Sequence, residues 1–168
     1  EAQMIEIKNN GPKDRDLRIV YTGMFGTSEV HALREDVIFS TVVAQSEVFF
    51  DENNEIKAIS FNPNPKWTKG NIRFATLMTT EFDKNGNKTG NVIFPTEYCA
   101  RYSDFVGNGT LYNPQFIGFL SNKPSFKGPG FYALASSFKV QAGAYTRIDG
   151  FTCLSSDAVN PNFEDEVT

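Results

Sequence analysis

Residues able to do acid–base chemistry are few in this 168-residue chain, and their spacing assembles no recognised catalytic group. His31 is the only histidine, so any histidine-activated nucleophile would depend on it. No GxSxG nucleophile elbow occurs, and the neighbours Glu29 and Glu35 favour a solvent-facing histidine. Glu81 and Glu97 are candidate carboxylates for glycoside hydrolysis, but both fall on the less apolar face of a predicted hairpin, where solvated acids are expected. We therefore assign no catalytic residue and expect no cofactor.

A run of alternating oxygen-bearing residues from Asp83 to Thr89 has the spacing that begins a calcium loop. An EF-hand loop requires glycine at its sixth position and glutamate at its twelfth, and this run places Lys88 and Phe94 there. Two cysteines and one histidine offer no CxxC or HxxxH pair for zinc. Turn formation explains the same residues, so we predict no metal site.

Aromatic residues give the chain its most suggestive pattern for binding. Tyrosine and tryptophan combine an apolar face with a polar edge, which suits sugar rings and planar apolar molecules. One tryptophan in a proline-rich loop and four tyrosines near predicted strand ends could line one opening, with an arginine beside them. The alternative is that they cap a core already rich in phenylalanine. The predicted ligand-binding residues are Trp67, Tyr98, Tyr102, Tyr112, Tyr132 and Arg101.

The two cysteines are an even count. Cys99 ends one predicted strand, and Cys153 lies in the last one. A bond between them would close a long loop, worth about 4 kcal/mol in the chain-entropy model. The alternative is a pair of buried thiols. We predict the disulfide.

Two sequons, beginning at Asn87 and Asn108, match the acceptor pattern for N-linked glycans. Asn87 falls at the tip of a predicted hairpin, where a glycan would be tolerated. Together with the disulfide, the sequons favour a secreted or extracytoplasmic glycoprotein. The chain starts at Glu1 with no leader-like segment, so a secreted form would already have lost its targeting peptide.

Charge and hydropathy argue against two classes of partner. A formal net charge of −4 and a pI near 5.0 do not supply the basic field that binds nucleic acid or anionic membranes. No apolar run approaches the roughly 20 residues of a membrane helix. We expect a soluble protein with neither nucleic-acid partner nor membrane insertion, and the sequence leaves its oligomeric state open.

A hairpin over residues 71–98 is the element around which the chain is organised. Apolar and polar residues alternate with period two in residues 72–82 and again in 92–98, as in half-buried strands. A three-residue loop, Lys84–Gly86, sets the stronger apolar faces on one side and places glycine where a left-handed residue is needed. The predicted cross-strand pairs are Met78 with Val92, Thr76 with Phe94 and Ile72 with Tyr98.

A second hairpin turns at residues 51–55 and is predicted to align Val48 with Ile59 and Phe50 with Lys57. The preceding residues, 37–50, are apolar on both faces at first, which indicates a central strand or one bent by a bulge. The helical candidate is 28–36. Further strands are expected over 4–8, 17–25, 100–106, 116–120, 131–140, 142–148 and 151–154.

About eight to eleven short strands at regular spacing predict one all-β domain over residues 1–168. Because successive hairpins follow one another, we prefer an antiparallel β-barrel, a calycin-like meander, over a β-sandwich, with at most one short helix. Residues 155–168 turn acidic and are expected to form a docked or frayed tail. The architecture suggests calycin-type carriers or dirigent-like cyclases, but the lipocalin Gly-x-Trp signature is absent, since Trp67 follows Pro65 and Lys66.

These patterns support three hypotheses about function. The first is a secreted, non-catalytic protein that holds a small apolar or glycan ligand in an aromatic-lined barrel or cleft. The second is a cofactor-independent cyclase or isomerase whose shaped pocket supplies most of the catalysis, with Glu97, Arg101 and Tyr102 as the nearest candidates. The third is an adhesin- or effector-type surface module that contacts its partner through loops 62–70 and 121–130.

Overall fold

The computed structural model describes residues 1–25, 42–63 and 72–155; the predicted helix over 28–36 with His31, Trp67 and the tail over 156–168 lie outside them. Strands dominate the described chain, which contains nine of them and one five-residue helix. The strands are β1 (Ala2–Lys8), β2 (Arg15–Met24), β3 (Gln45–Phe50), β4 (Ile56–Asn62), β5 (Ile72–Phe82), β6 (Lys88–Ile93), β7 (Glu97–Cys99), β8 (Phe131–Val140) and β9 (Tyr145–Ser155), and the helix is α2 (Tyr102–Val106).

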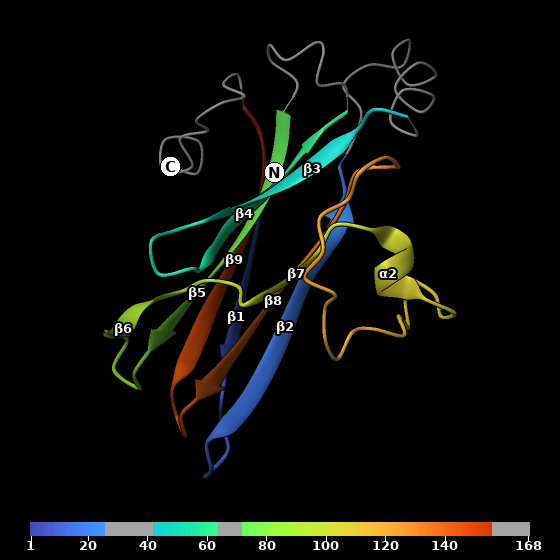
Figure 1. The fold of residues 1–168 in the computed structure, drawn as a ribbon. Helices are drawn as coiled ribbons and strands as arrows, with labels where there is room; N and C mark the ends of the chain where they lie inside the picture. Colours follow the sequence, from blue (N-terminus) through green and yellow to red (C-terminus); the bar gives the residue numbers. More distant parts are fainter. Residues whose placement is uncertain (26–41, 64–71, 156–168) are drawn as a thin grey trace.

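The strands form two antiparallel sheets that face each other across one core (Figure 1). The six-stranded sheet has the order β1-β9-β5-β4-β3, with β6 also paired to β5, and the three-stranded sheet has the order β2-β8-β7. Ile59 and Leu77 from the first sheet and Leu134 from the second are fully buried in the shared core. Antiparallel all-β structure is therefore confirmed, and the pairings of the described residues do not close into a barrel.

Aromatic rings fill the centre of the space between the sheets. A Cβ added to Gly150 of β9 would lie 2.8 Å from the ring of Tyr21 on β2, so the ring lies directly on this glycine. Tyr132 of β8 packs against Tyr21 and Phe25, with ring centroids 5.3 and 4.9 Å apart. Here the interior is occupied by side chains, and any cleft must lie nearer the sheet edges.

The turn between β5 and β6 forms as predicted. The N–H of Asp83 donates to the carbonyl of Asn87 at 2.9 Å, which leaves a three-residue loop, and Gly86 has a φ of 86°. Beside the turn Glu81 pairs with Thr89, the register expected for this loop. The local turn chemistry was therefore sufficient to predict this part of the hairpin.

Farther from the turn the predicted register is wrong. Between the Glu81–Thr89 and Thr79–Ile93 pairs, two steps along β5 correspond to four along β6, so β6 bulges. Beyond this point β5 pairs with β4 on the same side, while the chain after β6 crosses to the other sheet as β7. The predicted pairs that do not form are Met78 with Val92, Thr76 with Phe94 and Ile72 with Tyr98.

In the second hairpin Val48 pairs with Ile59 as predicted, but Phe50 pairs with Ile56 instead of Lys57. A register shift between Phe49 and Phe50 is the cause: one step along β3 corresponds to two along β4, so the extra residue, Lys57, lies in β4 and not in the strand for which a bulge was predicted. β3 is not a central strand: it forms the edge of the six-stranded sheet.

Two expected strands are absent, and two others form a single strand. Residues 102–106 form helix α2 because Tyr102, Phe105 and Val106 have helical spacing and pack on the outer face of the three-stranded sheet. Residues 116–120 are an irregular segment in which only Leu120 is buried. The two strands predicted over 142–148 and 151–154 are a single strand, β9, which continues through Gly150.

No disulfide joins Cys99 to Cys153, so the predicted bridge is wrong. Cys99 is buried on the outer face of the three-stranded sheet, in a cluster with Phe105. Cys153 lies in the other sheet, opposite Phe74. The sheets hold the two thiols on separate layers, whereas a disulfide requires Cα atoms within about 7 Å.

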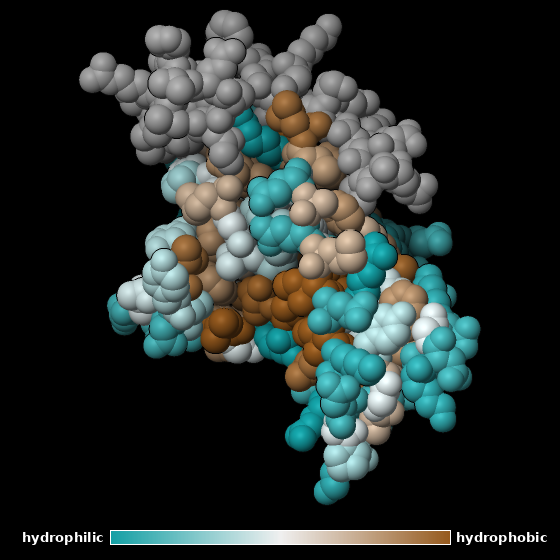
Figure 2. Space-filling view, turned by 180° about the vertical axis from the view of Figure 1, so that it is seen from behind, coloured by the Kyte–Doolittle hydropathy of each residue, from teal (hydrophilic) through white to brown (hydrophobic). Residues whose placement is uncertain are grey.

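The outer surface includes apolar areas. Seen from behind, apolar surface gathers near the centre of the molecule with hydrophilic surface around it (Figure 2). Strand β1 lies at the back in Figure 1, and its Met4 and Ile5 side chains are exposed. No helix within the described ranges is long and apolar enough to cross a membrane.

Candidate functional site

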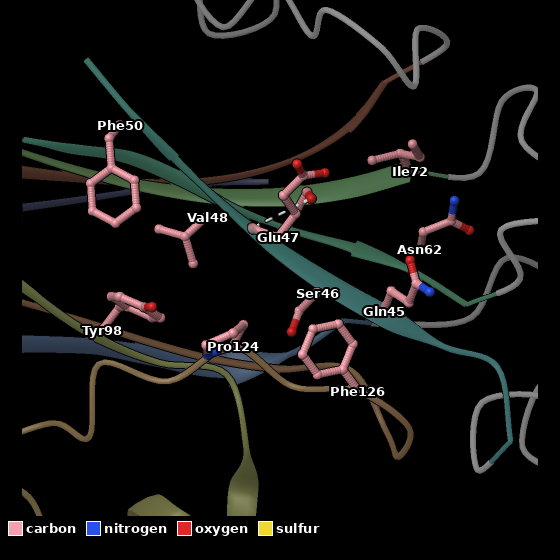
Figure 3. A pocket seen from close by; sticks show the side chains of 11 residues that line it. Gln45, Ser46, Glu47, Val48, Phe50, Asn62, Ile72, Tyr98, Pro124 and Phe126 are labelled. Atoms are coloured by element: carbon pink, nitrogen blue, oxygen red, sulfur yellow. Dashed lines mark hydrogen bonds between the residues drawn. The ribbon is translucent and has the colours of Figure 1, made fainter. Parts of the chain in front are cut away.

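A cleft of about 610 Å³ lies where β3, the edge of the six-stranded sheet, approaches β7, the edge of the three-stranded sheet (Figure 3). We call it the seam cleft. Its volume is in the range of small-molecule sites, about 300 to 1,000 Å³. The residues lining it are Gln45, Ser46, Glu47, Val48, Phe50, Ser60, Asn62, Ile72, Tyr98, Pro124 and Phe126.

Segment 122–127 joins the two sheet edges at the cleft. At one end, the N–H of Asn122 donates to the Tyr98 carbonyl and the Tyr98 N–H donates to the Asn122 side-chain oxygen, both at 2.8 Å. At the other end, the N–H of Ser46 donates to the Ser125 carbonyl at 3.0 Å, and the N–H of Lys127 donates to the Ala44 carbonyl at 2.8 Å. The cleft therefore has fixed walls on both sheets.

Aromatic and aliphatic side chains form the inner part of the cleft. The Phe50 ring, 47% exposed, meets the Tyr98 ring edge to face with centroids 6.3 Å apart. Val48 and Pro124 lie beside them, and Tyr98 extends into the cleft from the wall opposite β3 (Figure 3). Such an arrangement can hold a flat molecule with an apolar face.

The described lining of the seam cleft carries little charge. Glu47 and Tyr98 are the only ionisable groups among its described lining residues. Burial, with a smaller effect of Cys99, raises the pKa of Tyr98 above its ordinary value, so its hydroxyl is a neutral donor at physiological pH. Neither group is placed as a general base with a matched acid.

Glu97, a candidate for catalysis, does not line the cleft. Its carboxylate pairs with both terminal nitrogens of Arg18 and accepts the N–H of Leu120 at 2.7 Å. Partial burial would raise the pKa of Glu97, but the hydrogen bonds from Arg18 and Leu120 and the charge of Arg18 outweigh it, so the pKa is lowered. The contact is structural in character, since it ties β2 and β7 to the loop before Leu120.

Arg101 and Tyr102 lie together, but in a second depression of about 510 Å³. Tyr102, at the start of α2, meets the Phe131 ring edge to face and remains 40% exposed. Phe126 borders both this depression and the seam cleft, so the segment that carries it separates them.

Tyr132 and Tyr112, which were also predicted to bind, do not line the cleft. Tyr132 is buried in the shared core, where burial and a hydrogen bond with Tyr21 raise its pKa. Tyr112 is fully exposed on a turn over residues 110–113. Trp67 lies outside the described residues. Of the six predicted binding residues, the structure places Tyr98 in the seam cleft and brings Arg101 and Tyr102 together elsewhere.

Sequence reasoning missed Val48, Phe50 and Phe126 as cleft residues. The pattern of 37–50 indicated burial on both faces, and the edge position of β3 depends on pairing with distant strands. Phe126 lies in the Pro/Gly-rich loop 121–130, and its ring is exposed in the structure. An aromatic residue in such a loop is the sequence signal that could have identified it as a binding residue.

Both sequon residues, Asn87 and Asn108, are exposed. The Asn87 side chain donates to Asp83 at 3.1 Å within the hairpin turn. Across residues 1–25, 42–63 and 72–155, no three acidic, histidine or cysteine side chains gather to hold a metal ion. His31 lies outside these ranges, so the absence of a metal stays a prediction.

Comparison with known proteins found no family model that matches the chain and no curated protein similar to it in sequence.

Proposed function

We propose that the protein is a secreted, non-catalytic binding protein that holds a small apolar or glycan ligand in the seam cleft. The observation that carries the proposal is the cleft of about 610 Å³ between two sheet edges, with Phe50 and Tyr98 on facing walls. We also propose a sandwich-like arrangement, in which the ligand lies in the open seam because the centre between the sheets is filled by rings such as Tyr21 and Tyr132.

Binding is favoured over catalysis by the composition of the cleft. Its described lining offers one carboxylate and one tyrosine, and no cationic side chain or histidine. The cyclase or isomerase alternative requires an ionisable group whose pKa suits proton transfer. Glu97 is committed to Arg18, and the raised pKa of Tyr98 makes it a poor base.

Native and denaturing mass spectrometry of the protein from its natural source tests the proposal. We expect a captured mass that is lost on denaturation. The same protein with Phe50→Ala should lose that mass, because the exposed ring forms a wall of the cleft. Phe119→Ala is the matched control, since Phe119 is also an exposed phenyl group but lies outside the cleft. Equal retention by both variants would contradict the proposal. So would the absence of a captured mass together with no binding to a printed glycan array or to 1-anilinonaphthalene-8-sulfonate.

A surface interaction module is the second candidate, and exposed apolar side chains favour it. Leu111, Tyr112, Ile117 and Phe119 are exposed in one loop region, and Phe126 is exposed in the loop predicted to meet a partner. Retention of a protein partner by the wild type and its loss in Tyr112→Ala, with no small ligand captured, would favour this function over the first.

A further inference from the structure

The chemistry of the ligand can be narrowed from the backbone of β3, and this step rests on the proposed function. One side of β3 is paired with β4, and the other side is not paired with a described strand. The N–H of Ser46 and the carbonyl of Ala44 point to this second side, because they are bonded to Ser125 and Lys127. In an antiparallel pair the backbone groups of alternate residues point to opposite sides. Both the N–H and the carbonyl of Val48 therefore point away from β4, along the edge that borders the seam cleft.

The open edge is short. Toward the start of β3, the Ser46 N–H and side chain are bonded to Ser125 at 2.8 to 3.0 Å. Toward its end, β3 stops at Phe50 and the turn at Asp51 follows; the register shift between Phe49 and Phe50 places its extra residue, Lys57, in β4. By the same alternation the backbone groups of Phe50 point outward as well, so Val48 and Phe50 are the residues whose backbone donors and acceptors face the open part of this edge among the described residues.

A wholly apolar ligand would be a poor occupant. Filling the cleft with hydrocarbon would remove water from the Val48 N–H and carbonyl and leave both unsatisfied, which is unfavourable for each buried group. The Tyr98 hydroxyl, which has no hydrogen bond to another described residue, would add a third. A ligand carrying hydroxyl groups avoids this cost, because each hydroxyl both donates and accepts.

A peptide strand is a less suitable occupant than a sugar. Strand addition draws its affinity from a succession of main-chain bonds along an edge. Here Ser125 occupies the edge at Ser46, and β3 ends at Phe50 before the turn at Asp51, so an added ladder would reach only Val48 and Phe50. A sugar needs only a few bonds, and it presents an apolar face to rings such as Phe50 and Tyr98.

We propose that the seam cleft binds a neutral saccharide whose apolar face lies against Phe50 and Tyr98 while its hydroxyls bond the N–H and carbonyl of Val48. Neutrality follows from the described lining residues, among which Glu47 is the charged group and none is a cation that could hold an acidic sugar. The β3 wall supplies the backbone bonds and the Phe50 ring, and the facing wall supplies the Tyr98 ring and its hydroxyl.

Amide hydrogen exchange of the wild-type protein tests the premise. The Val48 amide should exchange faster than those of Glu47 and Phe49, whose N–H groups point toward β4. Protection of Val48 equal to that of its two neighbours would overturn the proposal, because no open edge would exist.

The ligand class is tested with a printed glycan array, followed by amide NMR titration with the best-bound neutral sugar. The Val48 amide resonance should shift on binding. Val48→Pro removes the outward N–H without removing a ladder bond, a position where edge strands tolerate proline. Val48→Ala is the matched control, because it loses the side chain and keeps the N–H. We expect about tenfold weaker binding in the proline variant than in the alanine variant, the equivalent of one hydrogen bond.

The other outcomes separate this proposal from the proposed function. One such outcome is that no sugar on the array binds, while 1-anilinonaphthalene-8-sulfonate binds in the cleft and this binding is lost in Phe50→Ala. That result would overturn the saccharide proposal but support the proposed ligand-binding function. A tetrapeptide that shifts the Val48 amide when no sugar does would also overturn it. No binding of any probe would overturn both. If Val48→Pro does not fold, the wild-type titration decides: an unshifted Val48 amide with bound sugar overturns the proposal.

Discussion

Arg18 and Glu97 join three parts of the chain through one carboxylate. The Arg18 Nη2 atom lies 3.1 Å from Glu97 Oε2, and the same oxygen accepts the N–H of Leu120. Both side chains are about three-quarters buried, so water screens the pair less than it does a surface pair. The segment that ends at Leu120 is neither strand nor helix, so it has no regular backbone hydrogen bonds of its own. The contact with Glu97 helps to hold it in place.

Glu97→Gln is expected to lower the free energy of unfolding at pH 7 by about 1–3 kcal/mol, because it removes a charge-assisted pair and weakens an accepted backbone bond. The pKa of Glu97 is lower in the folded than in the unfolded state. Its contribution is therefore present above the unfolded pKa, near 4.3, and is lost as pH falls through the folded pKa. Urea unfolding of wild type and variant should show their difference shrinking in acid.

Asp16→Asn is the control for this prediction. Asp16 pairs with Lys139 at 3.9 Å on the same sheet, but both side chains are mostly exposed, so its loss should change stability little. If Glu97→Gln and Asp16→Asn had equally small effects at pH 7, Glu97 would not have the stabilising role described here.

At the scale of elements, the two hairpin turns repeat one design. Asp51 accepts the N–H groups of Asn53 and Glu55 at 2.9 and 2.8 Å, and Asp83 accepts those of the equivalent residues Asn85 and Asn87. Backbone donors, those of Glu55 and Asn87 foremost, lower the pKa of Asp51 and Asp83. The carboxylate of Asp83, which stands at the first position of the calcium-loop pattern, thus stabilises a hairpin turn.

Gly86 and Asn54 occupy the same place in these turns, with φ of 86° and 62°. Gly86→Ala should cost about 1 kcal/mol, because an L side chain is strained in this conformation. Asn54→Gly should cause no loss, since glycine adopts the conformation freely. Thermal unfolding of both variants measures the difference, and an alanine variant as stable as wild type would show that the turn does not hold Gly86 in this geometry.

Local chemistry explains which elements were predictable. The turn at Asp83–Asn87 and the Val48–Ile59 pair were both found, because each depends on residues close in sequence. Helix α2 was missed because five residues with apolar groups at helical spacing are too short to distinguish from a strand. In the cleft, Tyr98 was predicted from its residue type. The role proposed for Val48 depends on the direction of its backbone N–H and carbonyl, which its residue type does not reveal.

At the scale of the whole molecule, the sequence did not predict which strands pair with each other. β5 pairs with β9 along its length and, on its other side, with β4 and β6 in turn. Each of these partners offers the same alternation of apolar and polar residues, so periodicity cannot rank them. The disulfide prediction failed for the same reason, because it required knowing that Cys99 and Cys153 lie in different sheets.

The two sheets pack against each other through contacts such as that of the Tyr21 ring with Gly150. The contribution of this contact to stability can be measured. A methyl group at Gly150 would lie 2.8 Å from a ring that is itself packed against Tyr132, so the ring must shift or the sheets must separate. Gly150→Ala should therefore lower the free energy of unfolding by about 1–3 kcal/mol, the usual cost of overpacking. Gly118→Ala is the matched control, because a methyl group there meets no atom within 4 Å. Urea unfolding of both variants makes the comparison. Equal stability of the two would mean that the sheets are not in contact at this point, and the seam would then continue into the interior where the structure has a packed core.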